Sequence, residues 1–185
     1  MNLNTKVVTG PNTRIVFPHL FDKNPMNDNY GAKFIFSKKD KTGIEMLKNG
    51  ILAAYQQGAT KLKGNGNSIP PLETLRSVLR DGDLEKPDDP LYANCYFLNA
   101  NSTIPPGIVD ANCNPILDRT QVYSGCYGRV SLSFFAYSTA GAKGIAAGLN
   151  HVQILRDGEP LGGRSTAASD FSGLTNTCDE DDFLS

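Results

Sequence analysis

Hydrophobic and polar residues alternate in several short segments of the chain, and this pattern is typical of β-strands. The most regular alternation covers residues 127–137. Further strands are expected at residues 13–17, 30–36, 92–98, 108–110 and 149–155. Pro18 should mark the end of the first strand or an edge position, because proline cannot donate a hydrogen bond to a neighbouring strand.

A helical period replaces this alternation after residue 40. Apolar residues from Ile44 to Ala54 recur on one face of a helix, Asp40 and Thr42 are candidate N-caps, and Gly58 ends the pattern. A second, shorter amphipathic segment at residues 72–79 follows Pro71, a residue favoured at the start of a helix.

Loops are predicted between these elements. Residues 61–67 are basic and rich in glycine and asparagine, which indicates a mobile loop. Residues 81–83 form a turn signal, and residues 101–106 are rich in turn-forming residues. Residues 141–148 are small and rich in glycine, so the last strand is expected to begin only after them.

Several short strands with one inserted helix favour a mainly β protein. We expect an OB-like five-stranded β-barrel with an inserted α-helix, although composition alone also permits a β-sandwich. From about Ser165 the chain consists largely of Ser, Thr, Ala and Gly with isolated apolar residues, which cannot bury enough surface to order it. The predicted organisation is one domain over residues 1–164 and a disordered acidic tail over residues 165–185.

Charge is distributed unevenly, although the formal net charge is only −1. Residues 1–63 contain ten Lys/Arg against four Asp/Glu. Residues 171–185 contain four acidic residues and no basic ones. A basic first third and an acidic end indicate a binding partner of negative charge and a separate function for the tail.

The strand over residues 127–137 has two chemically different faces. Its even positions from Val130 to Ala136 are apolar and suit a core. Its odd positions carry Tyr127, Arg129, Phe135 and Tyr137 together with two serines. Aromatic rings beside a cation suit single-stranded nucleic acid, because bases stack on rings and cations attract phosphates. The alternative is that Phe135 and Tyr137 pack beneath a loop or helix.

Further cations surround this pattern. The segment 30–36 combines Lys33 with aromatic residues, and one of its two faces must be core. The other candidate phosphate contacts are Lys38, Lys39, Lys41, Lys61 and Lys63. They form either an electrostatic groove or an ordinary solvated surface. Arg14, Arg76 and Arg80 are additional candidates that the sequence does not place.

The tail ends in an acidic run followed by apolar residues. Its candidate partner-binding residues are Asp179, Glu180, Asp181, Asp182 and Phe183. An acidic run with a terminal apolar pair on a flexible tether suits docking into an apolar pocket with a basic rim. It would also compete with phosphates for the protein's own cationic surface.

Residue types that commonly carry catalysis or bind metals lack the spacing that such sites need. The four cysteines are too widely separated for a CxxC pair, so reduced, mostly buried thiols are expected, and the two histidines belong to no ligand cluster. Residues 141–148 lack the dinucleotide-binding spacing, and Gly64–Gly66 lacks the lysine and hydroxyl of a P-loop. The acidic residues of 81–89 do not fit an EF-hand. We therefore predict a non-enzymatic protein with no cofactor and no metal.

The order of several segments resembles a family of phage proteins that bind single-stranded DNA, a family first catalogued as a domain of unknown function. The similar segments are Arg14–Phe21, Tyr30–Lys38, Tyr123–Val130, Gly144–Gln153 and the acidic tail. The resemblance covers nearly the full chain. It implies an OB-fold like that of the single-stranded DNA-binding proteins of short-tailed phages.

The resemblance also implies a function. It implies binding of DNA without sequence preference and without catalysis, in phage DNA replication, recombination or repair, with a tail that recruits replication or repair proteins. Such tails commonly end on phenylalanine, whereas Leu184 and Ser185 follow Phe183 here, so a phage-encoded partner is the simpler expectation. The chain contains no apolar run of about 18 residues and no secretory signal, so we expect the bacterial host cytoplasm and no membrane.

Other readings of the residues stay open. A protein–protein adaptor would carry the same tail, an RNA-binding protein would use the same stacking chemistry, and a small nuclease would need a metal–carboxylate site. Self-association into a homo-oligomer is not decided by the sequence.

Overall fold

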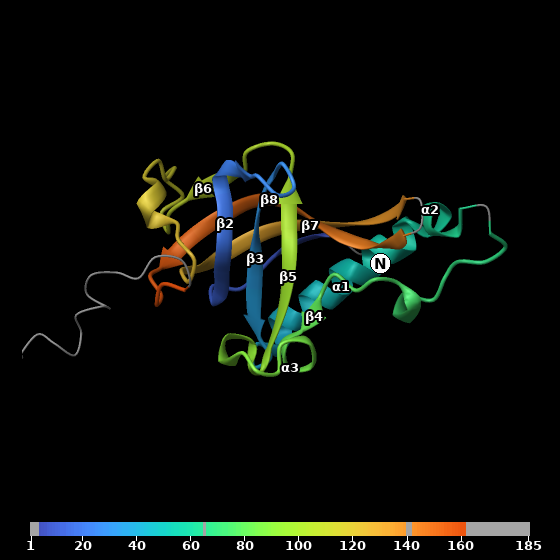
Figure 1. The fold of residues 1–185 in the computed structure, drawn as a ribbon. Coiled ribbons are helices and arrows are strands. Elements are labelled where there is room, and N and C mark those ends of the chain that lie inside the picture. Colours follow the sequence, from blue (N-terminus) through green and yellow to red (C-terminus); the bar gives the residue numbers. More distant parts are fainter. Residues whose placement is uncertain (1–3, 65, 140–141, 162–185) are drawn as a thin grey trace, which may run out of the picture.

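β-Strands supply most of the regular structure in the computed structural model, which describes residues 4–64, 66–139 and 142–161 (Figure 1). The strands are β1 (Lys6–Val8), β2 (Thr13–Asn24), β3 (Asn29–Ser37), β4 (Arg80–Asp81), β5 (Cys95–Ser102), β6 (Gly107–Val109), β7 (Tyr127–Thr139) and β8 (Ala142–Arg156). The α-helices of these residues are α1 (Lys41–Gln57), α2 (Ala59–Lys63) and α3 (Gly82–Glu85). Short 3-10 turns lie at Leu72–Thr74, Pro90–Tyr92 and Arg119–Gln121.

Five of the strands form a closed ring of pairings. β7 pairs with β2, β2 with β3, β3 with β5, β5 with β8, and β8 again with β7. All of these pairings are antiparallel except β5–β8, which is parallel at Ala100–Ala147 and Asn101–Gly148. β1, β4 and β6 extend the sheet from β7, β5 and β8. The mainly β, OB-like class with an inserted helix is therefore confirmed.

The main core lies inside this ring and follows the predicted alternation. Phe34, Leu98 and Leu132 are almost fully buried, and they come from β3, β5 and β7. α1 begins after Asp40, whose side chain accepts a hydrogen bond from the Gly43 N–H, and it ends at Gly58 as predicted. The helix packs its buried face against β7 and β1. This packing closes one side of the core.

A smaller apolar cluster lies on the opposite face of β2, β3 and β5. Val16, Ile35, Phe97 and Tyr92 form it, and Tyr92 belongs to the 3-10 turn before β5. The turn covers only one end of this outer face. Leu161, which follows β8, also packs partly against the cluster, and the face is hollowed around Lys33 and Asn99.

β2 is longer than predicted, because it continues through Pro18 to Asn24. Its pairing with β7 ends at Arg14, and its register with β3 shifts between Val16 and His19. Pro18 therefore lies at a bulge in a stretch with one paired edge, a position where proline is tolerated. The expectation of an edge position is correct, and that of a strand end is wrong.

Two predicted loops are regular structure instead. In the segment 61–67, residues up to Lys63 belong to α2, because fully buried Leu62 anchors this turn of helix to the core. The glycine-rich segment 141–148 belongs to β8 from Ala142 onward, since β7 pairs with it as far as Thr139–Ala142. Tertiary pairing overrides the weak strand propensity of small residues there.

The amphipathic segment 72–79 is not a helix. Only Leu72–Thr74 forms a 3-10 turn, and the chain then continues to β4. Leu79 is buried, and Leu72, Leu75 and Val78 pack partly against the core. The apolar side chains of this segment therefore pack against the core from an irregular chain path and not from a helix. Residues 82–85 form α3 rather than a turn.

β5 runs from Cys95 to Ser102, later than the predicted 92–98, because its full length pairs with β3. Among the described cysteines, Cys126 is buried, Cys95 is half-buried and Cys113 is exposed, and none forms a disulfide. Within the described residues, no helix is both long and apolar enough to cross a membrane.

Candidate nucleic-acid interface

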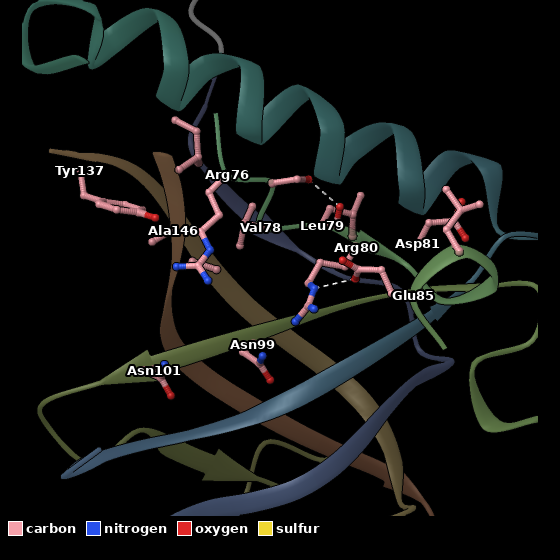
Figure 2. A pocket seen from close by; sticks show the side chains of 14 residues that line it. Arg76, Val78, Leu79, Arg80, Asp81, Glu85, Asn99, Asn101, Tyr137 and Ala146 are labelled. Carbon is pink, nitrogen blue, oxygen red and sulfur yellow. Dashed lines mark hydrogen bonds and ion pairs between the residues drawn. The ribbon is translucent and has the colours of Figure 1, made fainter. Parts of the chain in front are cut away.

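Two adjoining hollows meet on the outer face of β5. The arginine hollow has a volume of about 740 Å³ and is lined by residues 76–81, by α3, by β5 and by paired residues near the end of β7 and the start of β8 (Figure 2). The hairpin hollow has a volume of about 790 Å³ and is lined by β2, β3, their connecting turn and β5. Both include Asn99 and Asn101, so we call them together the groove.

Two arginines line the arginine hollow. Figure 2 shows the Arg76 side chain projecting beside Ala146, with Tyr137 on the same side of the hollow. Among the described residues, no carboxylate forms an ion pair with Arg76. The Arg80 Nε donates to Glu85 Oε2 at 2.6 Å, and its guanidinium lies 5.0 Å from the centroid of the Phe97 ring. The hollow thus presents one unpaired and one partly neutralised cation.

Lys33 occupies the hairpin hollow on the outer face of β3. Its Nζ lies 5.4–5.6 Å from the ring centroids of Phe17, Tyr92 and Phe97, and it donates to Tyr92 Oη at 3.3 Å. Burial, and then repulsion from Arg80, lower the pKa of Lys33. The ammonium is therefore partly desolvated and would gain from an incoming anion.

The amides of Asn99 and Asn101 form the floor that the two hollows share. They are exposed, occupy alternate positions of β5 and so point to the same face. No side-chain hydrogen bond is found for either amide within the described part of the chain. Gly31 opposite leaves the room that Asn101 needs, since a Cβ there would lie 2.2 Å from Asn101 Oδ1. Both amides can therefore donate to and accept from a ligand.

Phe17 forms the wall of the hairpin hollow beside Lys33. The residue is 54% exposed. This exposure does not follow from the sequence pattern, because the alternation of 13–17 places residue 17 on the same face as buried Ile15. The signal that could have found it is the proline that follows, since it indicates a bulge that turns a side chain to the other face.

The groove contains two of the nine predicted DNA-binding residues, Lys33 and Tyr137. Phe135 is 48% exposed but lies outside the groove, in a separate hollow with Lys61 between the helices and β7. Lys63 is exposed on α2.

Tyr127 and Arg129 lie at the other end of β7, and Tyr127 is roughly 33 Å from Tyr137 at about 3.3 Å per residue. Tyr127 packs with Arg14 and Arg156, whose guanidinium carbons lie 5.2 and 4.0 Å from its ring centroid. Arg129 Nη1 donates to the Thr9 carbonyl at 3.4 Å. The aromatic and cationic residues of β7 are thus spread along the strand and are not all gathered in the groove.

Lys38 and Lys39 follow the end of β3 and line neither hollow of the groove, although Lys38 contacts Asp81 at the edge of the arginine hollow. Lys38 Nζ lies 2.7 Å from both Asp81 Oδ1 and Asp83 Oδ2, and these hydrogen bonds raise its pKa and lower those of the two aspartates. Lys39 lines a different, smaller hollow. The predicted tail residues 179–183 lie outside the described residues.

Solved structures with the same fold come from phage proteins that bind single-stranded DNA. The C-terminal truncation of the single-stranded DNA-binding protein from bacteriophage Enc34 superposes with a TM-score of 0.69 and 18% identity, covering 85% of this chain and 88% of that one. The same protein in complex with single-stranded DNA gives 0.67 and 20%, covering 85% and 90%. The gp2.5 single-stranded DNA-binding protein of bacteriophage T7 gives 0.60 and 14%, covering 92% and 94%.

The sequence itself identifies the family. A family model described as the single-stranded DNA-binding protein of Enterobacter phage Enc34 matches residues 5–184. The chain therefore belongs to this family, which confirms the resemblance found from its segments. A relative, the putative protein p50 of Acyrthosiphon pisum secondary endosymbiont phage 1, is 32% identical over 178 residues, covering 92% of this chain and 95% of the relative.

Proposed function

We propose that this protein binds single-stranded DNA without sequence preference and that the strand lies along the groove. The observation that carries the proposal is the combination of Lys33, Arg76 and Arg80 with the rings of Phe17 and Tyr137 on one open face. Cations that attract phosphates and rings that stack on bases are the two components of general single-strand binding. Membership of the family supports the same function.

The amides between the two hollows are compatible with any base. Each presents a donor and an acceptor side by side, and the base edges of an unpaired strand are free to match them. A duplex would keep these edges paired and its bases stacked within the helix. The groove should therefore prefer single strands to double strands.

Fluorescence anisotropy with a labelled oligonucleotide tests this function. We expect single-stranded DNA to bind more tightly than the matching duplex, with log affinity falling linearly with log salt by about 0.7 per phosphate contact. The Arg76→Ala variant should reduce the salt slope by about 0.7, since each lost ion pair releases one counterion fewer. Lys48→Ala is the matched control, because Lys48 is exposed on α1 and lines neither hollow.

No binding of single strands at low salt, with the tail removed, would overturn the proposal. Equal affinity for duplex and single strand would overturn the preference. An RNA oligonucleotide of the same sequence belongs in the same titration, since stacking alone does not distinguish ribose from deoxyribose.

More widely, we propose that the protein acts as a non-enzymatic DNA-binding protein in phage DNA replication, recombination or repair within the host cytoplasm. The acidic tail, residues 179–183 above all, would recruit the other proteins of these processes and compete with DNA for the groove. The charge of residues 171–185 supports this, since four acids are accompanied by no base. An immobilised peptide of residues 171–185 that retains no phage replication or repair protein would contradict the recruitment role.

A further inference from the structure

Phe17 has a backbone conformation that is rare for a bulky residue. Its φ is +50°, in the left-handed region where the Cβ atom crowds the backbone. Such conformations persist only where the surrounding structure enforces them, and they concentrate at ligand-binding sites.

The conformation results from the bulge in β2 and turns the side chain outward. Ile15 pairs with Phe34 and is buried, so a regular strand would point residue 17 to the same core. The register shift between Val16 and His19 removes that constraint. The ring therefore gains exposure instead of burial, and the strain is not offset by packing into the core.

Two contacts hold Phe17 in place. Its backbone N–H donates to Ser124 Oγ at 3.1 Å, from the segment that leads into β7. Pro18 does not enforce this conformation, because proline favours a negative φ in the residue before it. The Lys33 ammonium lies 5.6 Å from the ring centroid. The ring is thus fixed beside a cation before any ligand arrives.

We propose that Phe17 is the base-stacking platform of the groove and that Ser124 is a positioning residue that holds it. This inference rests on the proposed binding of single-stranded DNA. A strained, exposed ring next to a partly desolvated ammonium fits one nucleotide, with the base on the ring and its phosphate near Lys33.

Other aromatic residues nearby are less suited to this role. Tyr92 and Phe97 are buried, and the T-shaped contact between their rings, 5.0 Å between centroids, occupies them with each other. Phe135 lies outside the groove. Tyr137 is only partly exposed, at the far end of the arginine hollow.

Tryptophan fluorescence tests the platform directly, because the chain contains no tryptophan. In a Phe17→Trp variant, stacking of a base on the indole should quench its emission as an oligo(dT) of about 15 nucleotides is added. An oligomer of abasic deoxyribose phosphates should not quench it. Leu117→Trp is the matched control, since Leu117 is 88% exposed and lies outside the groove, and its emission should stay unchanged.

Affinity provides the second measurement. Phe17→Ala should weaken binding of oligo(dT) by roughly 5- to 150-fold, the range for loss of one stacked base, and leave the salt slope unchanged. Ser124→Ala should weaken binding and reduce the quenching of the tryptophan variant, and Ser124→Thr, which keeps the hydroxyl, should restore both.

The outcomes separate this inference from the proposed function. If anisotropy shows tight binding while the tryptophan at position 17 is not quenched, or if Phe17→Ala binds like the parent, the platform is wrong and the function stands. If the parent itself binds no single strand, both are wrong. If Phe17→Ala does not fold, as judged by circular dichroism, the tryptophan variant decides.

Discussion

Lys33 is the residue in which the electrostatics of the groove can be measured. Its ammonium is partly buried among aromatic rings, and a phosphate brought close to it would favour the charged form. Because burial lowers its pKa, Lys33 should lose its proton at a lower pH than an ordinary lysine, whose pKa is 10.5.

Affinity for DNA should therefore respond to pH through Lys33. As the pH rises from neutrality towards 10.5, the parent should lose affinity sooner than a Lys33→Arg variant, because the guanidinium stays charged. The Kd of the parent divided by the Kd of the Lys33→Arg variant, both measured by anisotropy with the same oligonucleotide, should rise in this window. A constant ratio would contradict a cationic role for Lys33 in binding.

The contribution of Lys33 to stability should change in the opposite direction over the same window. A lysine with a lowered pKa in the folded state binds its proton more weakly there than in the unfolded chain. Its contribution to the free energy of unfolding is thus least favourable below the lowered pKa and improves as the pH rises towards 10.5.

At the scale of single elements, β7 and α1 were predictable because their side chains repeat strongly. Val130 and Leu132 alternate with polar residues, and Asp40 and Gly58 mark the helix ends that the structure has. The strand over 142–148 was not predictable, since its small residues are held by pairing with β7. The arginine hollow was missed for a related reason, because residues 72–79 have apolar spacing that fits both a helix and the extended path that they follow.

The β7–β8 pair contains a close approach that a substitution can probe. A Cβ on Gly128 would lie 1.9 Å from the carbonyl oxygen of Gln153, next to the register shift at the start of β7. Gly128→Ala should lower the free energy of unfolding by about 1–3 kcal/mol or more, because the backbones of β7 and β8 must move apart there. Urea denaturation measures this difference.

Gly148→Ala is the control in the same pair of strands. A Cβ there would lie 3.4 Å from the Ser133 carbonyl oxygen, an ordinary contact. Alanine also reduces the entropy of the unfolded chain, so this variant should be as stable as the parent or more stable by up to about 1 kcal/mol. Similar losses for both variants would show that the close approach is not specific to Gly128.

At the scale of the whole molecule, charge is separated between a basic first third and the acidic residues 171–185. If the tail competes with DNA for the groove, its removal should tighten binding of single strands at low salt. The difference should vanish as salt is raised, because screening weakens both the tail and the phosphates. Unchanged or weaker affinity at low salt after truncation would argue against competition.

The parallel pairing of β5 with β8 closes the ring late in the chain, and this has a consequence during synthesis on the ribosome. β2 and β3 can pair as soon as both have emerged, but the wall of the arginine hollow includes residues 145–147 of β8. Contacts between distant segments generally form more slowly than local ones. A nascent chain should therefore gain its affinity for DNA only when nearly all of it has been translated, so that DNA binding reports on completed folding.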